Sequence, residues 1–222
     1  MATARLFRLK AEVAPAPSGP VAESLPIAKV RVDTGVFHLD QLYDYSVPEK
    51  LSSSASIGVR VQIPFGGRET EGIVVSRSST AERAGELKPL TKVLSPHPVA
   101  TPASLQLIDD AAEFFCSNPW DLIRSAIPPR FAAVDKEFDP VATSINAPGT
   151  FVTPVFQSFT PYQPSHQQMV QLIGELRVRG SILIVAPDQK DVDLLYNELK
   201  SLNNHVLRLT SSTSREERYR SY

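Results

Sequence analysis

The triplet Tyr43-Asp44-Tyr45 is the most compact group of side chains in this sequence that could take part in molecular recognition. An aromatic ring can stack on a nucleobase, which contributes about 1–3 kcal/mol per base. A carboxylate can accept a hydrogen bond from an exocyclic amine or from a terminal hydroxyl. A structural interpretation stands beside this one: both tyrosines pack on a sheet and Asp44 lies at the surface. Residue types alone favour the structural interpretation, because paired tyrosines are common in strands.

Two further features could contact an anion. The turn Gly66-Gly67-Arg68 either closes a tight hairpin or presents backbone N–H groups to a phosphate or sugar, since glycine permits close approach. Lys88 could meet a phosphate as a point charge, although a solvated lysine is the default expectation. We would assign a binding role to either feature only if another feature of the sequence indicated a site at the same position.

Signatures of catalysis are missing from the sequence. No G-x-x-x-x-G-K-[ST] loop for ATP occurs, and neither G-x-S-x-G nor H-E-x-x-H is present. The four histidines are scattered without the spacing of metal ligands, and a single cysteine excludes internal disulfides and multi-cysteine zinc clusters. We expect that cysteine, Cys116, to be a small buried residue on the apolar face of a helix. The sequence predicts no catalytic residue, no metal site and no cofactor.

Composition indicates a globular protein without a membrane segment. Of the 222 residues, 42% are hydrophobic and 21% charged, and no apolar run is long enough to span a bilayer. The N-terminus has no apolar signal region, so we expect a cytoplasmic protein. Net charge is +2 over residues 1–100 and −3 over residues 101–222. Neither half has the basic field of a non-specific DNA binder, so any nucleic-acid contact should be a local pocket.

The pattern of residues predicts an α+β protein with several parts. Residues 1–26, rich in Ala, Pro and Ser, are expected to be a disordered leader. Five short strands separated by turn signals are typical of a small barrel or sandwich, and we expect a β-barrel over residues 27–99. Their expected positions are residues 27–33, 42–47, 59–63, 73–75 and 87–93. Gly72 is expected at a bulge or a close approach of two strands.

Helices are expected to follow. A helical extension at residues 100–131 begins with Thr101-Pro102, a strong helix start, and its apolar stripe ends at Phe115. Residues 132–160 are predicted to be a linker. In residues 161–222, apolar strands at 181–186 and 205–209 flank a helix, which predicts a partial, Rossmann-like parallel βαβ region.

The order of several short strings resembles one family. LDQLYDYSVPEKL, GVRVQIPFGGRETEGIVV, LKPLTKVLSPHPVATPASLQLIDDAAEFF and DLIRSAIPPR follow one another at suitable spacing. Together they resemble the N-terminal part of the PriA family of primosomal replication-restart proteins, over residues 27–131 and more weakly over 160–222. No single string is specific, but the ordered set is.

The resemblance implies a function and a site. In that family this segment captures the 3′ end of the nascent leading strand at an arrested replication fork. The family's end-binding residues fall on Tyr43, Asp44, Tyr45, Gly66 and Lys88, so three separate features become one expected DNA 3′-end pocket. The implied partners are forked or single-stranded DNA with a free 3′ end, primosome proteins and single-strand-binding protein.

The resemblance also concerns the C-terminal third of the chain. Residues 182–188 are similar to a strand and turn in the family's helicase core, whose cofactors are ATP with Mg²⁺, and zinc. Residues 175–181 occupy the place of the ATP-binding loop without its motif. We therefore expect a truncated, ATPase-lacking branch of the family.

Three hypotheses remain open. The first is a non-enzymatic restart protein that recognises nascent 3′ ends at stalled or abandoned forks. The second is a fragment or variant of an ATP-dependent 3′→5′ DNA helicase. The third is an interaction scaffold that has kept the fold and lost DNA contact.

Overall fold

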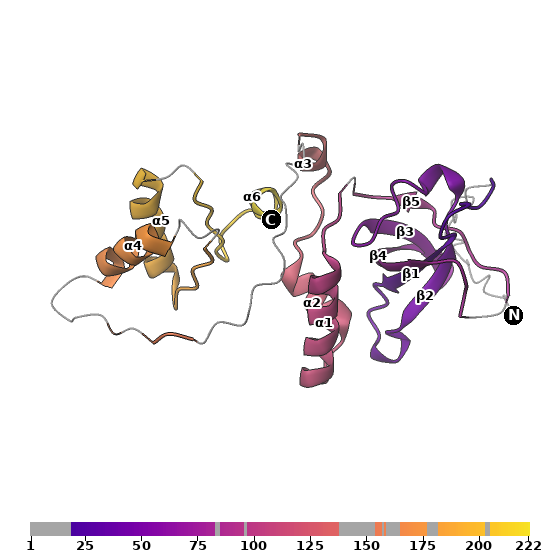
Figure 1. Ribbon diagram of the computed structural model, residues 1–222, viewed down its shortest axis with the longest axis horizontal. Coiled ribbons are helices and arrows are strands. Elements are labelled where there is room, and N and C mark those ends of the chain that lie inside the picture. Colours follow the sequence, from indigo (N-terminus) through magenta and orange to yellow (C-terminus); the bar gives the residue numbers. More distant parts are fainter. Residues whose placement is uncertain are drawn as a thin grey trace, which may run out of the picture. The chain divides into compact units, whose positions relative to one another are not determined.

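The computed structural model describes residues 19–82, 85–95, 97–137, 154–156, 158, 165–176, 182–202 and 205–222 (Figure 1). The chain divides into two compact units, Met1–Phe138 and Asp139–Tyr222. Among the described residues, the first unit contains a sheet and three α-helices, and the second contains three α-helices.

A five-stranded antiparallel sheet forms the body of the first unit, with the order β2-β1-β4-β3-β5. Its strands are β1 (Ile27–Val32), β2 (Leu42–Ser46), β3 (Arg60–Phe65), β4 (Arg68–Ser78) and β5 (Lys92–Val93). Two short 3₁₀ helices, η1 (Phe37–Leu39) and η2 (Glu49–Leu51), flank β2. All five expected strands are therefore present, although β4 is longer and β5 shorter than predicted.

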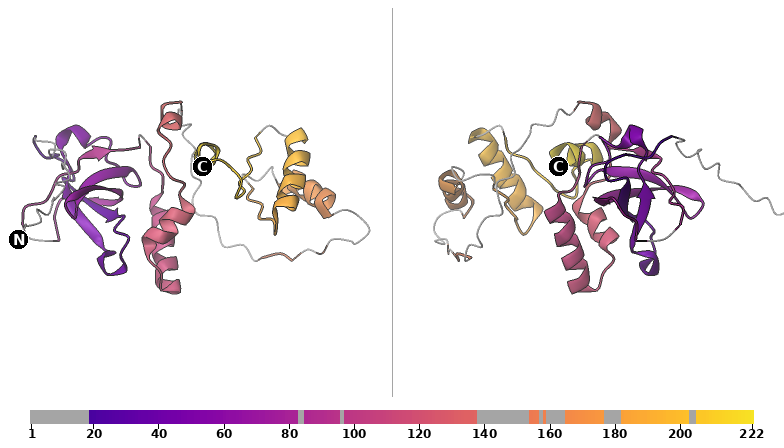
Figure 2. Two further views of the ribbon diagram at one scale, coloured as in Figure 1. Left: turned by 180° about the vertical axis from the view of Figure 1, so that it is seen from behind. Right: turned by 45° about the vertical axis from the view of Figure 1, so that its right-hand side comes forward.

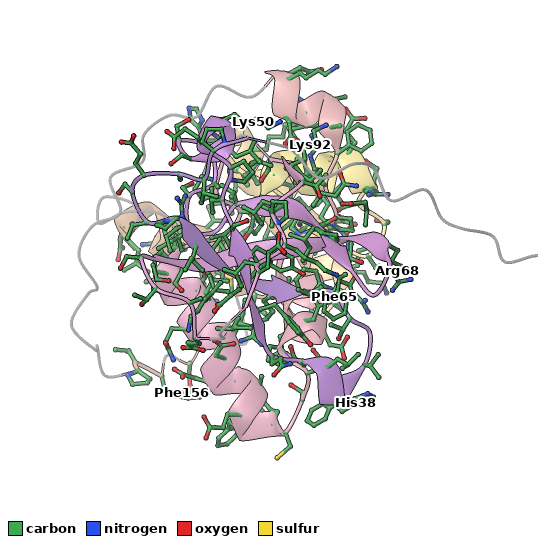
Figure 3. All side chains as sticks on the ribbon, turned by 90° about the vertical axis from the view of Figure 1, so that its right-hand side faces the viewer. His38, Lys50, Phe65, Arg68, Lys92 and Phe156 are labelled. Atoms are coloured by element: carbon green, nitrogen blue, oxygen red, sulfur yellow. The ribbon has the colours of Figure 1, made fainter. Side chains whose placement is uncertain are left out.

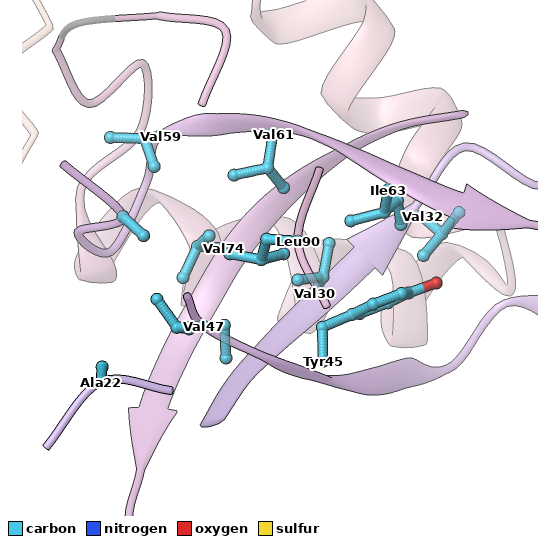
Figure 4. Close-up of a cluster of buried hydrophobic side chains, with 12 residues drawn as sticks. Ala22, Val30, Val32, Tyr45, Val47, Val59, Val61, Ile63, Val74 and Leu90 are labelled. Carbon is cyan, nitrogen blue, oxygen red and sulfur yellow. The ribbon is translucent and has the colours of Figure 1, made fainter. Parts of the chain in front are cut away.

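One face of the sheet encloses the main apolar core. Alternate residues of β1 and β3 point into it, because side chains along a strand alternate between the two faces. Val30, Val32, Val61 and Ile63 are fully buried or nearly so, and the ring of Tyr45 from β2 lies alongside them (Figure 4). Burying these branched side chains stabilises the sheet by about 1.5–3 kcal/mol for each.

Three glycines have the backbone roles that the sequence predicted. Gly66 and Gly67 have φ values of +58° and +80°, and they form a two-residue turn between the paired residues Phe65 and Arg68. Gly72 of β4 pairs with Val32 of β1. A Cβ atom there would stand 2.5 Å from Val30 Cγ1 and 2.8 Å from the Arg31 carbonyl oxygen.

The sheet is open, so the expected barrel is not confirmed. Its edge strands are β2 and β5, and within the described residues a single bridge, Ser46 to Pro89, joins β2 to the segment before β5. Ser46 N–H donates to the Lys88 carbonyl at 3.0 Å, and Leu90 N–H donates to the Ser46 carbonyl at 2.9 Å. The backbone groups that make this bridge belong to Lys88 and Leu90, and β5 has only two residues, so the described residues form no continuous ladder between β2 and β5.

The predicted leader is ordered over its last eight residues. From Gly19 the chain packs against the end of β2: Ala22 N–H donates to the Val47 carbonyl at 2.9 Å, and Ala22 is buried in the core. Val21 forms a bridge with Pro48. Disorder at residues 19–26 was therefore a wrong prediction, and residues 1–18 lie outside the described part.

Helices α1 (Pro102–Phe115) and α2 (Pro119–Ala126) lie side by side against the outer face of the sheet (Figure 2). Thr101 caps α1 by accepting from the Ser104 N–H, and Asn118 caps α2 by accepting from the Trp120 N–H, as proline at N1 predicted. Ile73 of β4 joins Ile108 and Trp120 in a second core. The guanidinium of Arg60 also donates to the Pro128 carbonyl at 2.6 Å, so the extension is held to β3 by a buried charge.

The C-terminal end of α1 differs from the prediction. Leu105, Ile108 and Ala112 are buried as expected, but Phe115 is 70% exposed and Cys116 is exposed as well. The chain turns at Cys116, which adopts the left-handed conformation with φ +50° and ends the helix. Phe114 and Phe115 in the last turn of α1 are therefore not covered by any described residue of the first unit.

A third helix, α3 (Ala132–Glu137), lies where a linker was expected. Val134 is buried, and Arg130 donates to the Asp135 carboxylate at 2.6 Å. The first six residues of the expected linker are therefore helical. Most of residues 138–164 lie outside the described part.

The second unit contains α4 (Ser165–Leu176), α5 (Gln189–Leu202) and α6 (Arg215–Ser221). His166 of α4 and Glu198 of α5 approach to 3.0 Å, and Leu195 and Leu199 of α5 are buried. The expected strands are absent from residues 182–186 and 205–209, so a Rossmann-like region is not shown. Leu183 and Val185 are more than 80% exposed. A strand buried on both faces needs neighbours on each side, and within the described residues these segments have none.

Candidate nucleic-acid interface

The triplet Tyr43-Asp44-Tyr45 lies in the middle of β2, an edge strand, and the sheet separates its members. In the antiparallel register, Tyr43 pairs with Val30, Asp44 with Lys29 and Tyr45 with Ala28. The two tyrosines point toward the core face, and Asp44 points to the opposite face. One short motif thus places aromatic rings and a carboxylate on different sides of the same strand.

Tyr45 is a core residue. Only 4% of it is exposed, and its hydroxyl lies 3.4 Å from the Pro64 carbonyl oxygen. Burial raises the pKa of the Tyr45 hydroxyl well above its usual value, and the nearby charges of ionised Tyr43 and Glu69 raise it further. Its ring is not accessible for stacking in this conformation, so its contribution is to hold β2 against β3.

Tyr43 is half-buried at the end of the sheet that carries the β3–β4 hairpin. Its ring meets that of Phe65 edge to face, with centroids 4.9 Å apart and an interplanar angle of 71°. Its hydroxyl donates to the Leu39 carbonyl at 2.8 Å and so connects β2 with η1. Tyr43 and Phe65 are therefore the aromatic pair that is partly accessible here.

Asp44 lies on the outer face of β2 among groups from a distant loop. One carboxylate oxygen accepts a hydrogen bond from the Glu82 N–H at 2.8 Å, and the Glu82 side chain forms an ion pair with Lys29. Asp44 remains half-exposed. The carboxylate can therefore accept further hydrogen bonds from outside the protein.

Gly66 and Lys88 lie near β2 because residues next to them in the chain, or their own backbone, contact that strand. Gly66 directly follows Phe65, whose ring contacts Tyr43, and no heavy atom lies within 4 Å of where a Cβ at Gly66 would stand. Lys88 lies next to β2 because its carbonyl accepts from Ser46, and it is exposed. Within the described residues, no hydrogen bond or ion pair connects Asp44 with either residue.

Sequence reasoning missed three contributors to this region. Phe65 was recognisable as the aromatic residue immediately before a two-glycine turn. Lys29 and Glu82 had no local signal, because their relation to Asp44 depends on strand pairing and on a loop 38 residues away.

A second charged cluster holds α1 to the sheet. The Arg31 guanidinium donates to Asp40 at 3.1 Å and to Asp109 of α1 at 2.7 Å, and it is largely buried. Burial raises the pKa of Asp109, and the Arg31 charge partly offsets that shift. These groups satisfy one another, and the cluster is structural.

A metal-ligand cluster and a membrane-spanning helix are both absent from the described part of the chain. No group of three or more His, Cys, Asp or Glu side chains there could hold a metal ion. No helix there is both long and apolar enough to cross a membrane.

The comparisons with known proteins concern this same region. The family model for the PriA 3′DNA-binding domain (3′BD) matches residues 29–128, which run from β1 to the end of the α2 segment and include all five expected site residues. The chain is PriA-like. The PriA-like match thus centres on the sheet and on the helices packed against it.

Full-length relatives extend the likeness beyond that domain. The probable replication restart protein PriA of Mycobacterium tuberculosis strain H37Rv is 32% identical in an alignment of 213 residues that covers 82% of this chain and 32% of the relative. The M. leprae protein of the same description is 28% identical over 209 residues, with the same coverage. Replication restart protein PriA of Bacillus subtilis is 32% identical over 75 residues, 33% of this chain and 9% of the relative. The chain therefore spans about a third of the length of its mycobacterial relatives.

Proposed function

We propose that this PriA-like chain acts in replication restart by binding the 3′ end of the nascent strand at stalled or abandoned DNA forks. The observation that carries the proposal is the match of residues 29–128 to a domain described as 3′DNA-binding. That match coincides with an edge strand that carries a partly exposed carboxylate on one face and a partly accessible aromatic pair on the other.

The geometry supports a distinct role for each residue. Asp44 supplies the acceptor for the exocyclic amine or the 3′-hydroxyl of the terminal nucleotide, because a carboxylate is the strongest acceptor available for such donors. Tyr43 supplies an aromatic edge at the entrance, and Tyr45 fixes the strand that positions both. Gly66 allows a sugar or base to approach the backbone, and Lys88 supplies a positive charge beside β2.

This function needs no nucleotide hydrolysis by the chain. The 222 residues contain no G-x-x-x-x-G-K-[ST] loop, so the proposed activity is DNA-end recognition without unwinding. A second candidate is that the chain is part of an ATP-dependent 3′→5′ DNA helicase. The mycobacterial relatives favour it to this extent: they are about three times as long, and their similarity covers 82% of the chain.

A binding experiment with matched DNA ends tests the main proposal. Two fluorescent single strands of one sequence, one ending in a 3′-hydroxyl and the other in a 3′-phosphate, are titrated with the full chain. We expect tighter binding of the 3′-hydroxyl strand, because a dianionic phosphate would be repelled by the Asp44 carboxylate. Equal affinity for the two strands would contradict end recognition. A third strand with a 5′-phosphate controls for charge alone.

A further inference from the structure

Arg68 differs from the other arginines in the described part of the first unit. Arg31, Arg60, Arg77, Arg124 and Arg130 each donate hydrogen bonds to carboxylates or backbone carbonyls. Arg68 is exposed, and within the described residues its guanidinium has no hydrogen-bond or ion-pair partner. A guanidinium with all its donors directed to solvent is available to an external anion.

Its position connects two features of the candidate interface. Arg68 pairs with Phe65 across the Gly66-Gly67 turn, and Phe65 contacts Tyr43. In Figure 3, Phe65 and Arg68 lie together at the β3–β4 hairpin. Arg68 also lines a surface groove of about 350 Å³ that continues from the hairpin toward Arg124. A strand ending at Asp44 and Tyr43 could therefore continue over the hairpin and past Arg68.

None of the three acidic residues of that groove forms an ion pair with Arg68 within the described residues. Asp33 accepts from Arg124 at 2.5 Å, and Glu71 forms an ion pair with Arg60. One carboxylate oxygen of Glu69 accepts from the Thr91 hydroxyl at 3.3 Å, and the other is buried without a hydrogen-bond partner. The Arg68 guanidinium is therefore not neutralised by a direct ion pair.

Building on the proposed function, we infer that Arg68 binds an internucleotide phosphate of the strand whose 3′ end is captured. A guanidinium can donate two parallel hydrogen bonds to one phosphodiester, which fixes the direction in which the strand leaves the pocket. Arg68 thus sets the path of the backbone, whereas Asp44 recognises the terminal nucleotide.

A double-mutant cycle between protein and DNA tests this contact. The probes are single strands with a 3′-hydroxyl in which one of the last three linkages is replaced by a neutral methylphosphonate. We expect Arg68→Ala to weaken binding of the unmodified strand about tenfold and to lower the salt dependence of binding by about one phosphate contact. Neutralising the contacted linkage should weaken DNA binding by the wild-type protein about tenfold. It should not weaken binding by Arg68→Ala any further. Arg68→Lys keeps the positive charge without the planar guanidinium. Its affinity for the unmodified strand should lie between those of wild type and Arg68→Ala.

The control is Lys50→Ala, which removes another exposed cation, on η2, away from the hairpin in Figure 3. Lys50→Ala should leave the affinity for the unmodified strand unchanged, and each methylphosphonate should have the same effect on this variant as on wild type. Additive losses at all three linkages, or an equal loss for Lys50→Ala, would overturn the assignment of Arg68. One outcome is that wild type binds the 3′-hydroxyl strand more tightly than the 3′-phosphate strand while the losses from Arg68→Ala and from each neutral linkage simply add. In that case only the inference about Arg68 fails. If wild type binds both ends equally, or binds neither, the proposed function fails with it.

Discussion

The carboxylate of Asp44 accepts a hydrogen bond from the backbone N–H of Glu82, 38 residues further along the chain, at a distance of 2.8 Å. The side chain of Glu82 is in turn paired with Lys29, the cross-strand neighbour of Asp44. The proposed recognition carboxylate is thus already oriented in the free protein. A donor on the ligand can use the remaining lone pairs of the Asp44 carboxylate, or it can replace the Glu82 N–H.

This contact yields a prediction with two substitutions of one residue. Asp44→Asn keeps a side-chain oxygen to accept from Glu82 and removes the charge, whereas Asp44→Ala removes both. We expect each to weaken binding of a 3′-hydroxyl strand about tenfold, since hydrogen bonds to charged groups are the strong ones. Asp44→Asn should melt within a few degrees of wild type. Fluorescence anisotropy and thermal unfolding measure the two effects, and wild-type affinity in Asp44→Asn would exclude a role for the charge.

Gly66 allows the turn and the binding site to be tested separately. Gly66→Asn creates an Asn-Gly turn, the preferred sequence for a hairpin with positive φ at both positions, so the free energy of unfolding should change by no more than about 0.5 kcal/mol. The new side chain occupies space that is open in the structure. If DNA approaches Gly66 closely, affinity for the 3′ end should fall. Gly67→Asn is the matched comparison, and an equal loss there would place the close approach elsewhere on the turn.

Gly72 tests the packing of β4 on β1. Gly72→Ala places a methyl group 2.5 Å from Val30 Cγ1 and 2.8 Å from a backbone oxygen, so the strands must separate. We expect the free energy of unfolding in urea to fall by about 1–3 kcal/mol. Adding Val30→Ala should relieve part of the clash, and the double variant should therefore be more stable than the sum of the single effects predicts. Strict additivity would show that the methyl group is accommodated without contact to Val30.

Local patterns predicted much of the fold of the first unit. Alternation in β1 and β3, the two-glycine turn, the close approach at Gly72 and the caps of α1 and α2 each depend on residues near one another in sequence. The exposure of Phe115 and Cys116 could not be read in this way. Helical periodicity shows which residues share a face, but the end of the packing surface is set by the sheet and α2.

The site was only partly predictable for a similar reason. The alternation of β2 placed Tyr43 and Tyr45 on one face and Asp44 on the other, as the structure shows. The burial of Tyr45 and the contact of Tyr43 with Phe65 depend on how β3 packs over the core face. In the second unit, apolar runs indicated strands, but a run becomes a strand only where another strand pairs with it.

Tyr45 predicts a loss of stability at alkaline pH. Its folded pKa is raised above the ordinary value of 10, mainly by burial, so the folded state holds the phenolic proton more tightly than the unfolded state does. The stabilisation is fully present below pH 10 and is lost as pH rises above it, by up to about 1.4 kcal/mol per pH unit. Tyr45→Phe cannot ionise, and at pH 7 it should lose no more than about 1 kcal/mol, for one long hydrogen bond. Urea unfolding is measured at pH 8, 10 and 11. As pH rises, the free energy of unfolding of Tyr45→Phe should increase relative to that of wild type. A constant difference between the two proteins would mean that Tyr45 ionises as easily in the folded state as in the unfolded state.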